Sequence, residues 1–214
     1  MLNRLHTTID SAIPWVGVIA AALPCFYLSW VLIGVWREPM AWDDGNWVRL
    51  GVGLLLLEFL LLHSGAFMVA VLEQKEELKK QLQMAIGLLA FYSLMVWAFS
   101  VSLDVPALIW IFAGITLGRS LSLLRSPSES KQAMMARSAI GVVLYLLVVA
   151  GTIFLPIPEL GMTSAVLNEV YPDRGTGLWE AMPERAIAGA ALYFALIGVA
   201  EITLLRPKAA KADK

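Results

Sequence analysis

Six long apolar stretches, separated by short polar segments, constrain this chain more than any other feature of its sequence. They cover residues 12–36, 47–72, 82–103, 106–124, 138–156 and 186–205. Each comes close to the roughly 20 residues that a helix needs to cross a hydrocarbon core about 30 Å thick. In lipid the backbone must satisfy its own hydrogen bonds, and the stretches are too long for barrel strands. The sequence therefore predicts an all-α, polytopic integral membrane protein with a bundle of about six transmembrane helices.

The composition agrees with this class. The chain is 59% hydrophobic and 15% charged, whereas about 25% of the residues of a soluble domain are charged. No segment between the stretches is long enough to build its own core, so we expect residues 1–214 to form a single transmembrane domain. Residues 206–214 read as a basic cytoplasmic tail that anionic lipid headgroups would attract. Because topology accounts for the basic residues, they do not indicate nucleic acid.

The Lys and Arg residues predict the orientation of the chain. With six crossings, eleven of the sixteen lie on the side of the two termini, four lie on the other side, and Arg119 lies within a stretch. Positively charged loops mark the cytoplasmic side. We therefore expect both termini in the cytoplasm and the protein in the cell's inner or plasma membrane. The long segment 157–185 is then an outer loop, mainly a surface cover, with a short helix around Thr163–Val170.

Tryptophan is also unevenly distributed. Seven of the eight tryptophans fall on or near the predicted outer half, and only Trp15 falls on the inner side. We interpret them as an aromatic belt that anchors the helices at the outer headgroup level. The alternative is a docking surface for a lipid, a pigment or a partner protein.

Four ionisable residues fall inside the predicted spans, where a charge is costly and therefore a candidate for function. They are Glu58, His63, Arg119 and Glu201. Glu58 and His63 flank the middle of the second span, about 140° apart around the helix, so they do not share a face. Together they suit a proton or cation path, because a midplane carboxyl and an imidazole are the groups that such a path uses. Alternatively, a neighbouring helix bonds Glu58, and a backbone carbonyl or a hydroxyl such as that of Ser93 or Tyr92 bonds His63.

Arg119 and Glu201 lie at similar predicted depth in the inner leaflet, on the fourth and sixth spans. We expect an intramembrane salt bridge between them that clamps the two helices, and a transport gate is the alternative. Gly114 and Gly118 form a GxxxG on the fourth span, which predicts a helix-packing face inside the chain or between subunits.

The sequence offers few ligands for a metal or a cofactor. Cys25 is the only cysteine, and His6 and His63 are the only histidines. A bis-histidine haem across two helices is therefore excluded within one chain, and we expect no metal site. At most, His63 serves as the single axial ligand of a haem or a pigment.

These observations favour a membrane-embedded, non-catalytic subunit that packs against other membrane proteins, pigments or lipids in a larger complex, or against a second copy. The alternative is a small proton- or cation-coupled transporter or channel that uses Glu58 and His63 at the midplane. A third hypothesis, an intramembrane enzyme or haem protein, has the least support, because one His and one Glu make a thin catalytic set.

Overall fold

The computed structural model describes residues 2–73, 77–125 and 127–203, and the predicted basic tail 206–214 lies outside these ranges. Within them the chain forms helices and loops and no strand. The long helices are α1 (Leu2–Arg37), α2 (Asn46–Glu73), α3 (Leu78–Ser102), α4 (Ala107–Arg125), α5 (Pro127–Phe154) and α8 (Pro183–Thr203). The short ones are η1 (Pro39–Ala41), η2 (Asp43–Gly45), α6 (Ser164–Val170) and α7 (Leu178–Ala181).

The prediction of an all-helical chain with membrane-spanning helices is confirmed for the described residues. Five of their helices are long and apolar enough to cross a membrane, namely those in α1, α2, α3, α5 and α8. The apolar part of α4, Ala107–Gly118, is shorter. A sixth crossing through α4 and the orientation of the termini stay predictions.

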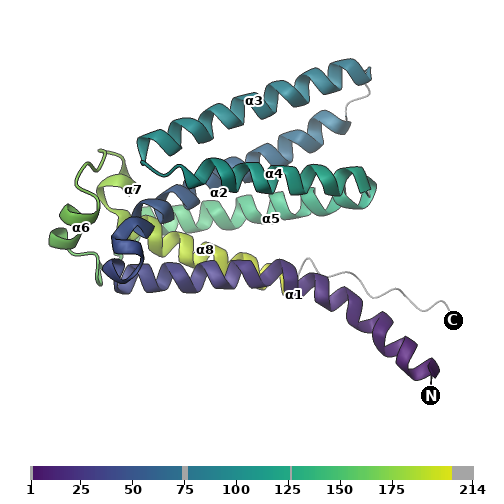
Figure 1. The fold of residues 1–214 in the computed structure, drawn as a ribbon, viewed down its shortest axis with the longest axis horizontal. Coiled ribbons are helices and arrows are strands. Elements are labelled where there is room, and N and C mark those ends of the chain that lie inside the picture. Colours follow the sequence, from purple (N-terminus) through teal and green to yellow (C-terminus); the bar gives the residue numbers. More distant parts are fainter. Residues whose placement is uncertain (1, 74–76, 126, 204–214) are drawn as a thin grey trace.

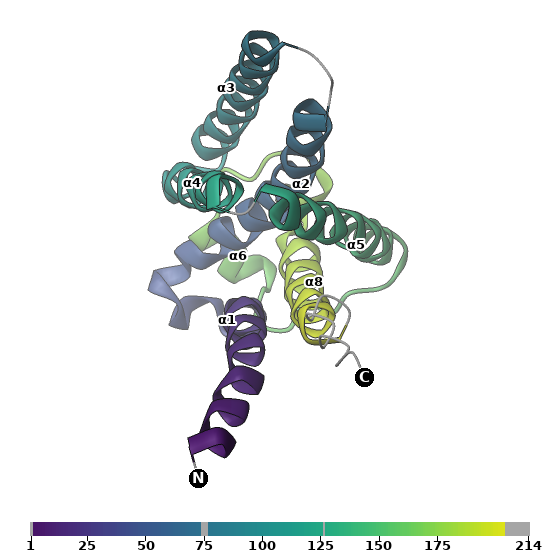
Figure 2. The same cartoon turned by 90° about the vertical axis from the view of Figure 1, so that its right-hand side faces the viewer.

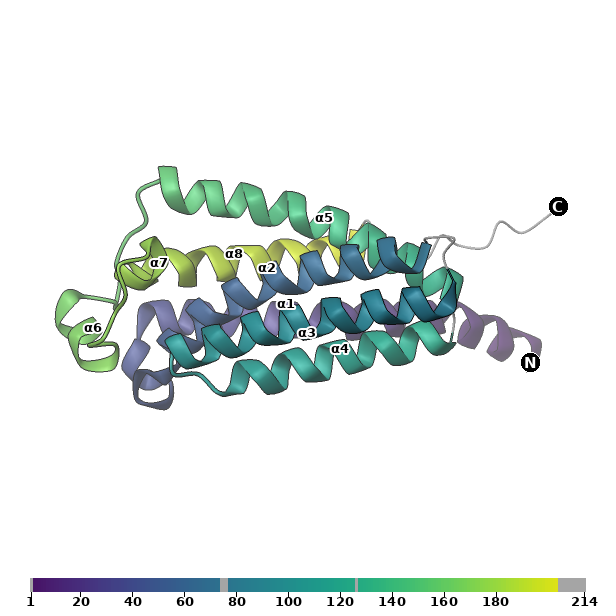
Figure 3. The ribbon, with the colours of Figure 1, turned by 90° about the horizontal axis from the view of Figure 1, so that it is seen from above.

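The long helices run alternately in opposite directions along one bundle (Figure 1). α1, α3 and α5 end where η1, η2, α6 and α7 gather, and α2, α4 and α8 begin there; we call this the capped end. Seen from above, α6 and α7 lie together at that end (Figure 3). The short helix expected around Thr163–Val170 is confirmed as α6, with the Thr163 hydroxyl accepting a hydrogen bond from the N–H of Val166.

α2 is the central helix of the bundle, because it packs against α1, α3, α4, α5 and α8 (Figure 2). α3 lies at one edge, far from the pair formed by α1 and α8. Only 17% of the residues in the apolar window of α3 are buried, compared with 56% in α8. Of the five spanning helices in the described residues, α3 is therefore the least covered by the chain itself.

Small residues let α8 approach its neighbours closely, as is common for helices packed in membranes. Ala186 and Ala190 are fully buried, and a side chain at Gly189 would overlap Thr152 of α5. Ser29 of α1 donates a hydrogen bond of 2.8 Å to the carbonyl of Ala191. Among the described helices, α8 packs most extensively against α1, so the first and the last long helix form the tightest pair.

The capped end depends on a glycine in the turn between α1 and α2. Gly45 has φ +88, in the left-handed region that favours glycine, and a Cβ there would overlap the side chain of Val170 in α6. The loop before α6 is fastened to the end of α1 by two hydrogen bonds. The Trp36 indole N–H donates to the carbonyl of Pro158 at 2.9 Å, and the Gly161 N–H donates to the carbonyl of Trp36 at 3.1 Å.

Several tryptophans gather toward the capped end, and the aromatic-belt interpretation of them stays a prediction. Trp36 and Trp179 hold loops in place through their indole N–H groups, whereas Trp30, Trp97 and Trp110 are 60%, 55% and 77% exposed. The side chain of Trp15 lies outside the described part of the structure. Tryptophan side chains are enriched where the hydrocarbon core of a membrane meets the lipid headgroups.

Candidate functional site

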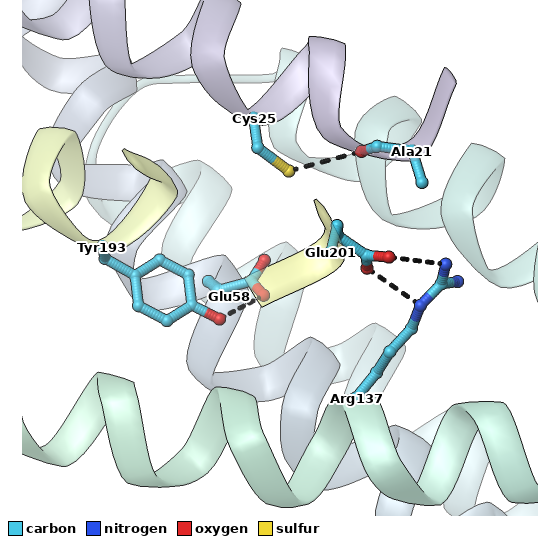
Figure 4. Close-up of polar contacts among 6 residues, drawn as sticks. All are labelled: Ala21, Cys25, Glu58, Arg137, Tyr193 and Glu201. Atoms are coloured by element: carbon cyan, nitrogen blue, oxygen red, sulfur yellow. Dashed lines mark hydrogen bonds and ion pairs between the residues drawn. The ribbon is translucent and has the colours of Figure 1, made fainter. Parts of the chain in front are cut away.

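Polar side chains from four helices gather between the middle of the bundle and the end opposite the capped end. Figure 4 shows them together, and we call them the buried polar cluster: Cys25, Glu58, Arg137, Tyr193 and Glu201. They come from α1, α2, α5 and α8. Because α2 and α8 both lie in the interior, the carboxyl and phenol groups of Glu58, Tyr193 and Glu201 each need a partner within the protein.

Glu58 is bonded by a tyrosine of α8. The Tyr193 hydroxyl donates a hydrogen bond of 2.8 Å to Oε1 of Glu58, and the Tyr193 side chain is 0% exposed. A second phenol supports this contact, because the Tyr145 ring packs edge-on against the Tyr193 ring at 5.8 Å. The Tyr145 hydroxyl in turn donates to the carbonyl of Leu55 at 3.2 Å. This set of contacts ties α2, α5 and α8 together at the depth of Glu58.

Glu201 forms a two-point ion pair with Arg137 of α5. Arg137 Nε lies 2.9 Å from Oε1 of Glu201, and Nη2 donates to Oε2 at 3.0 Å. The carboxylate side chain is 10% exposed and the arginine side chain is 53% exposed. This fork geometry is the strongest that a single ion pair adopts.

The predicted pairing of Glu201 with Arg119 stays a prediction, since the Arg119 side chain lies outside the described residues. Sequence reasoning missed Arg137 as a site residue. The signal was present: Arg137 directly precedes the fifth predicted span, and Glu201 lies five residues before Arg206 at the end of the sixth. The sequence therefore predicts similar depths for the two residues, near the same membrane surface.

Cys25 lies on the α1 side of the cluster, facing Glu58 and Glu201 (Figure 4). Its thiol is 3.6 Å from the carbonyl of Ala21, one turn earlier in the same helix.

His63 does not join the buried polar cluster, in agreement with the 140° that separates it from Glu58 around α2. Its Nδ1 lies 2.8 Å from the carbonyl oxygen of Phe59, and its ring packs on the Phe59 ring at 4.0 Å. Because a carbonyl only accepts, Nδ1 carries the hydrogen, and Nε2 is the nitrogen that could ligate a haem or a pigment. This ligation stays a prediction.

Gly114 and Gly118 lie on the outward face of α4, and a Cβ at either position meets no atom within 4 Å. Beside this face is a groove of about 360 Å³ between α3 and α4. We call it the α3–α4 groove; it is lined by Leu89, Ser93, Val96, Ile109, Phe112, Ala113, Thr116 and Leu117. Nothing in the sequence marked this groove, because its apolar residues match those of any lipid-facing helix.

Within the described ranges, no three His, Cys, Asp or Glu side chains come close enough to hold a metal ion. The cluster instead combines two carboxyl groups, a phenol, a thiol and a guanidinium, and Tyr145 adds a second phenol beside it. This arrangement can fix the positions of helices, and it contains groups that exchange protons.

Comparison with known proteins found no matching family model, no similar curated sequence and no similar solved structure.

Proposed function

We propose that this protein is a membrane-embedded, non-catalytic subunit whose α3–α4 hairpin docks a transmembrane helix of another membrane protein. The proposal places it in the cell's inner or plasma membrane with six crossings and both termini in the cytoplasm. The observation that supports it most is the exposed surface of this hairpin. The weakly buried α3 and the neighbouring α4 form a groove of about 360 Å³, and the glycine face of α4 leaves room for another helix to approach closely.

A hydroxyl in the groove supports a protein partner. Ser93 lines the groove and makes no hydrogen bond with the described residues. Hydroxyls on apolar helices commonly bond across to a neighbouring helix, which contributes about 1 kcal/mol. A partner helix would supply such a contact, whereas a lipid tail would not.

The bonding of the ionisable residues supports a structural role over a chemical one. Glu58 accepts from Tyr193, Glu201 pairs with Arg137, and His63 contacts the carbonyl of Phe59. A polar group that is satisfied inside the chain fixes the arrangement of helices and needs no substrate to complete it. The buried polar cluster then serves as the rigid centre that presents the hairpin.

The test is the size of the particle extracted gently from native membranes. We expect the wild-type chain to run with a partner at a mass well above that of one chain. Ser93→Leu fills the groove and Gly118→Leu covers the glycine face, so each should release the chain from that particle. The purified variants should keep the helical content and thermal unfolding of the wild type, because both positions are exposed.

Gly87→Leu is the matched control. Gly87 is on α3, a Cβ there meets no atom within 4 Å, and it lies about 120° round the helix from Ser93. This variant should keep the large particle. If Ser93→Leu and Gly118→Leu run with the same partner as the wild type, the hairpin is not the docking surface.

A second candidate is a small proton- or cation-coupled transporter, which the buried polar cluster favours. Its members form a row from Tyr193 and Glu58 to the partly exposed Arg137 (Figure 4). In reconstituted vesicles under a proton gradient, this function predicts flux that Glu58→Gln abolishes, since the amide cannot carry the proton. Ordinary flux in Glu58→Gln would remove Glu58 from any such path.

A further inference from the structure

A hollow on the outside of α1, at the capped end, combines aromatic walls with one charge of each sign. Its volume is about 330 Å³ and it is lined by Trp30, Ile33, Gly34, Arg37, Glu38 and Trp42. We call it the tryptophan hollow. It opens where the apolar span Val18–Arg37 ends, which is the depth at which lipid headgroups lie.

The walls of the hollow are held in place by packing. The Trp42 indole lies over Gly34, and a Cβ at that position would overlap its ring. Trp30 and Trp42 meet edge to face with centroids 5.7 Å apart, and Trp42 meets Trp47 in the same way at 6.2 Å. The glycine thus lets the turn after α1 fold back on the helix and form the second wall.

The two charges at the mouth are available to a ligand. Arg37 is in the last turn of α1 and Glu38 follows it directly. Both side chains are exposed, and neither forms an ion pair or a side-chain hydrogen bond with the described residues. A guanidinium binds phosphate through two parallel hydrogen bonds. A carboxylate accepts hydrogen bonds from a primary ammonium, and an indole face attracts the same cation.

The apolar side of the hollow continues into the hydrocarbon region. Trp30 is 60% exposed and Ile33 is 43% exposed, and Tyr27, one turn before, is 58% exposed. These side chains lie on the same face of α1 as Arg37, one to three turns nearer the middle of the span. A molecule with its phosphate at Arg37 and its ammonium at Glu38 would place its acyl chains along this strip.

We propose that the tryptophan hollow binds the headgroup of a zwitterionic phospholipid with a primary amine, a phosphoethanolamine lipid. Arg37 holds the phosphate, Glu38 accepts from the ammonium, and the indoles of Trp30 and Trp42 enclose the ethanolamine. A choline headgroup carries no N–H that could donate a hydrogen bond to Glu38. An anionic headgroup without an amine leaves the Glu38 carboxylate with no cation to pair with. The site is independent of partner docking on the α3–α4 hairpin.

The experiment is native mass spectrometry of the delipidated, full-length protein titrated with single lipids in detergent. We expect phosphatidylethanolamine to bind about tenfold more tightly than phosphatidylcholine or phosphatidylglycerol, a ratio typical of one charge-assisted contact. Arg37→Gln should weaken phosphatidylethanolamine binding by about tenfold. Glu38→Gln should remove the preference over phosphatidylglycerol. Trp30→Leu should weaken binding, whereas the control Trp110→Leu, at another exposed tryptophan, should not.

Two results would overturn the proposal. One is equal binding of the three lipids to the wild type; the other is wild-type binding by Arg37→Gln, provided that thermal unfolding shows both proteins folded. Gly34→Leu gives an independent check, because it displaces Trp42 without changing a charge, and it should also weaken binding. The last measurement is competition between soluble phosphoethanolamine and bound phosphatidylethanolamine. Weak competition supports a lipid ligand. If soluble phosphoethanolamine displaces the lipid as effectively as the lipid itself does, the hollow binds a soluble ligand instead.

Discussion

The ion pair between Arg137 and Glu201 gives the most direct test of the buried polar cluster, because its two members differ in exposure. The Glu201 side chain is 10% exposed and the Arg137 side chain is 53% exposed. Replacing either one by methionine breaks the same two contacts. The residue left behind differs: Arg137→Met strands a buried carboxylate, whereas Glu201→Met strands a cation that can turn toward water or lipid phosphate.

The magnitudes follow from this asymmetry. Removing one partner of a fully buried pair costs about 3–5 kcal/mol. Because more than half of Arg137 is exposed, solvent screening reduces the value for Arg137→Met to about 2–3 kcal/mol. For Glu201→Met we expect about 1 kcal/mol, within the range of exposed pairs. The double variant should be no less stable than Arg137→Met, since no unpaired charge remains.

The assay is the free energy of unfolding in mixed micelles, titrated with a denaturing detergent and followed by helical content. Arg137→Lys is the control that keeps the charge and loses the fork geometry, and it should lie between the wild type and Arg137→Met. Equal losses in the two methionine variants, or a larger loss in Glu201→Met, would refute the reasoning. Such a result would mean that the carboxylate finds another partner.

Three further outcomes are expected. Gly45→Ala should lower the free energy of unfolding by about 2 kcal/mol, since alanine is strained at positive φ and its Cβ overlaps Val170; Gly87→Ala, an exposed helical control, should leave it unchanged or raise it by up to about 1 kcal/mol. Tyr193→Phe should cost about 1–2 kcal/mol by removing the donor to Glu58, measured in the same titration. In a Cys25→Ala background, Glu159→Cys should react with an impermeant maleimide on intact cells and Lys79→Cys should not; the reverse pattern would invert the proposed orientation.

The helices of this protein could be predicted well from the sequence, and the contacts between them could not. Hydrophobic length alone locates a membrane helix, so the stretch 47–72 anticipated α2 (Asn46–Glu73) to within one residue at each end. The predicted stretch 138–156 begins eleven residues after the observed start of α5 at Pro127. The first part of α5 is polar, so hydrophobicity could not predict it. Lipid defines where a helix is apolar, and it does not define where the helix begins.

The side chains that bond the intramembrane residues could be identified only from the three-dimensional structure. Glu58 and His63 were identified as costly, and their separation around α2 followed from helical geometry. The hydrogen bond from Tyr193 to Glu58 depends on the rotation of α8 about its own axis. Small residues such as Ala190 and Gly189 determine that rotation through packing. Arg137 was counted only as a cytoplasmic marker, because a residue at a span boundary can face either water or a neighbouring helix. The tryptophan hollow combined residues from α1 and the following turn, which come together only when Trp42 folds back over Gly34.

The pairing of α1 with α8 has a consequence for how the chain is made. The hydrogen bond from Ser29 to Ala191 joins residues 162 positions apart, and α1 has far less contact with α2, its neighbour in sequence. At a synthesis rate of about 5–20 residues per second, α1 would wait roughly 10–30 s in the membrane before its main partner emerges from the ribosome. During that interval Ser29 and the α1 face around it are open to hydrocarbon or to an insertion factor. Assembly of this bundle is therefore completed by its final helix, and a ribosome that stalls before α8 leaves the first helix without its neighbour.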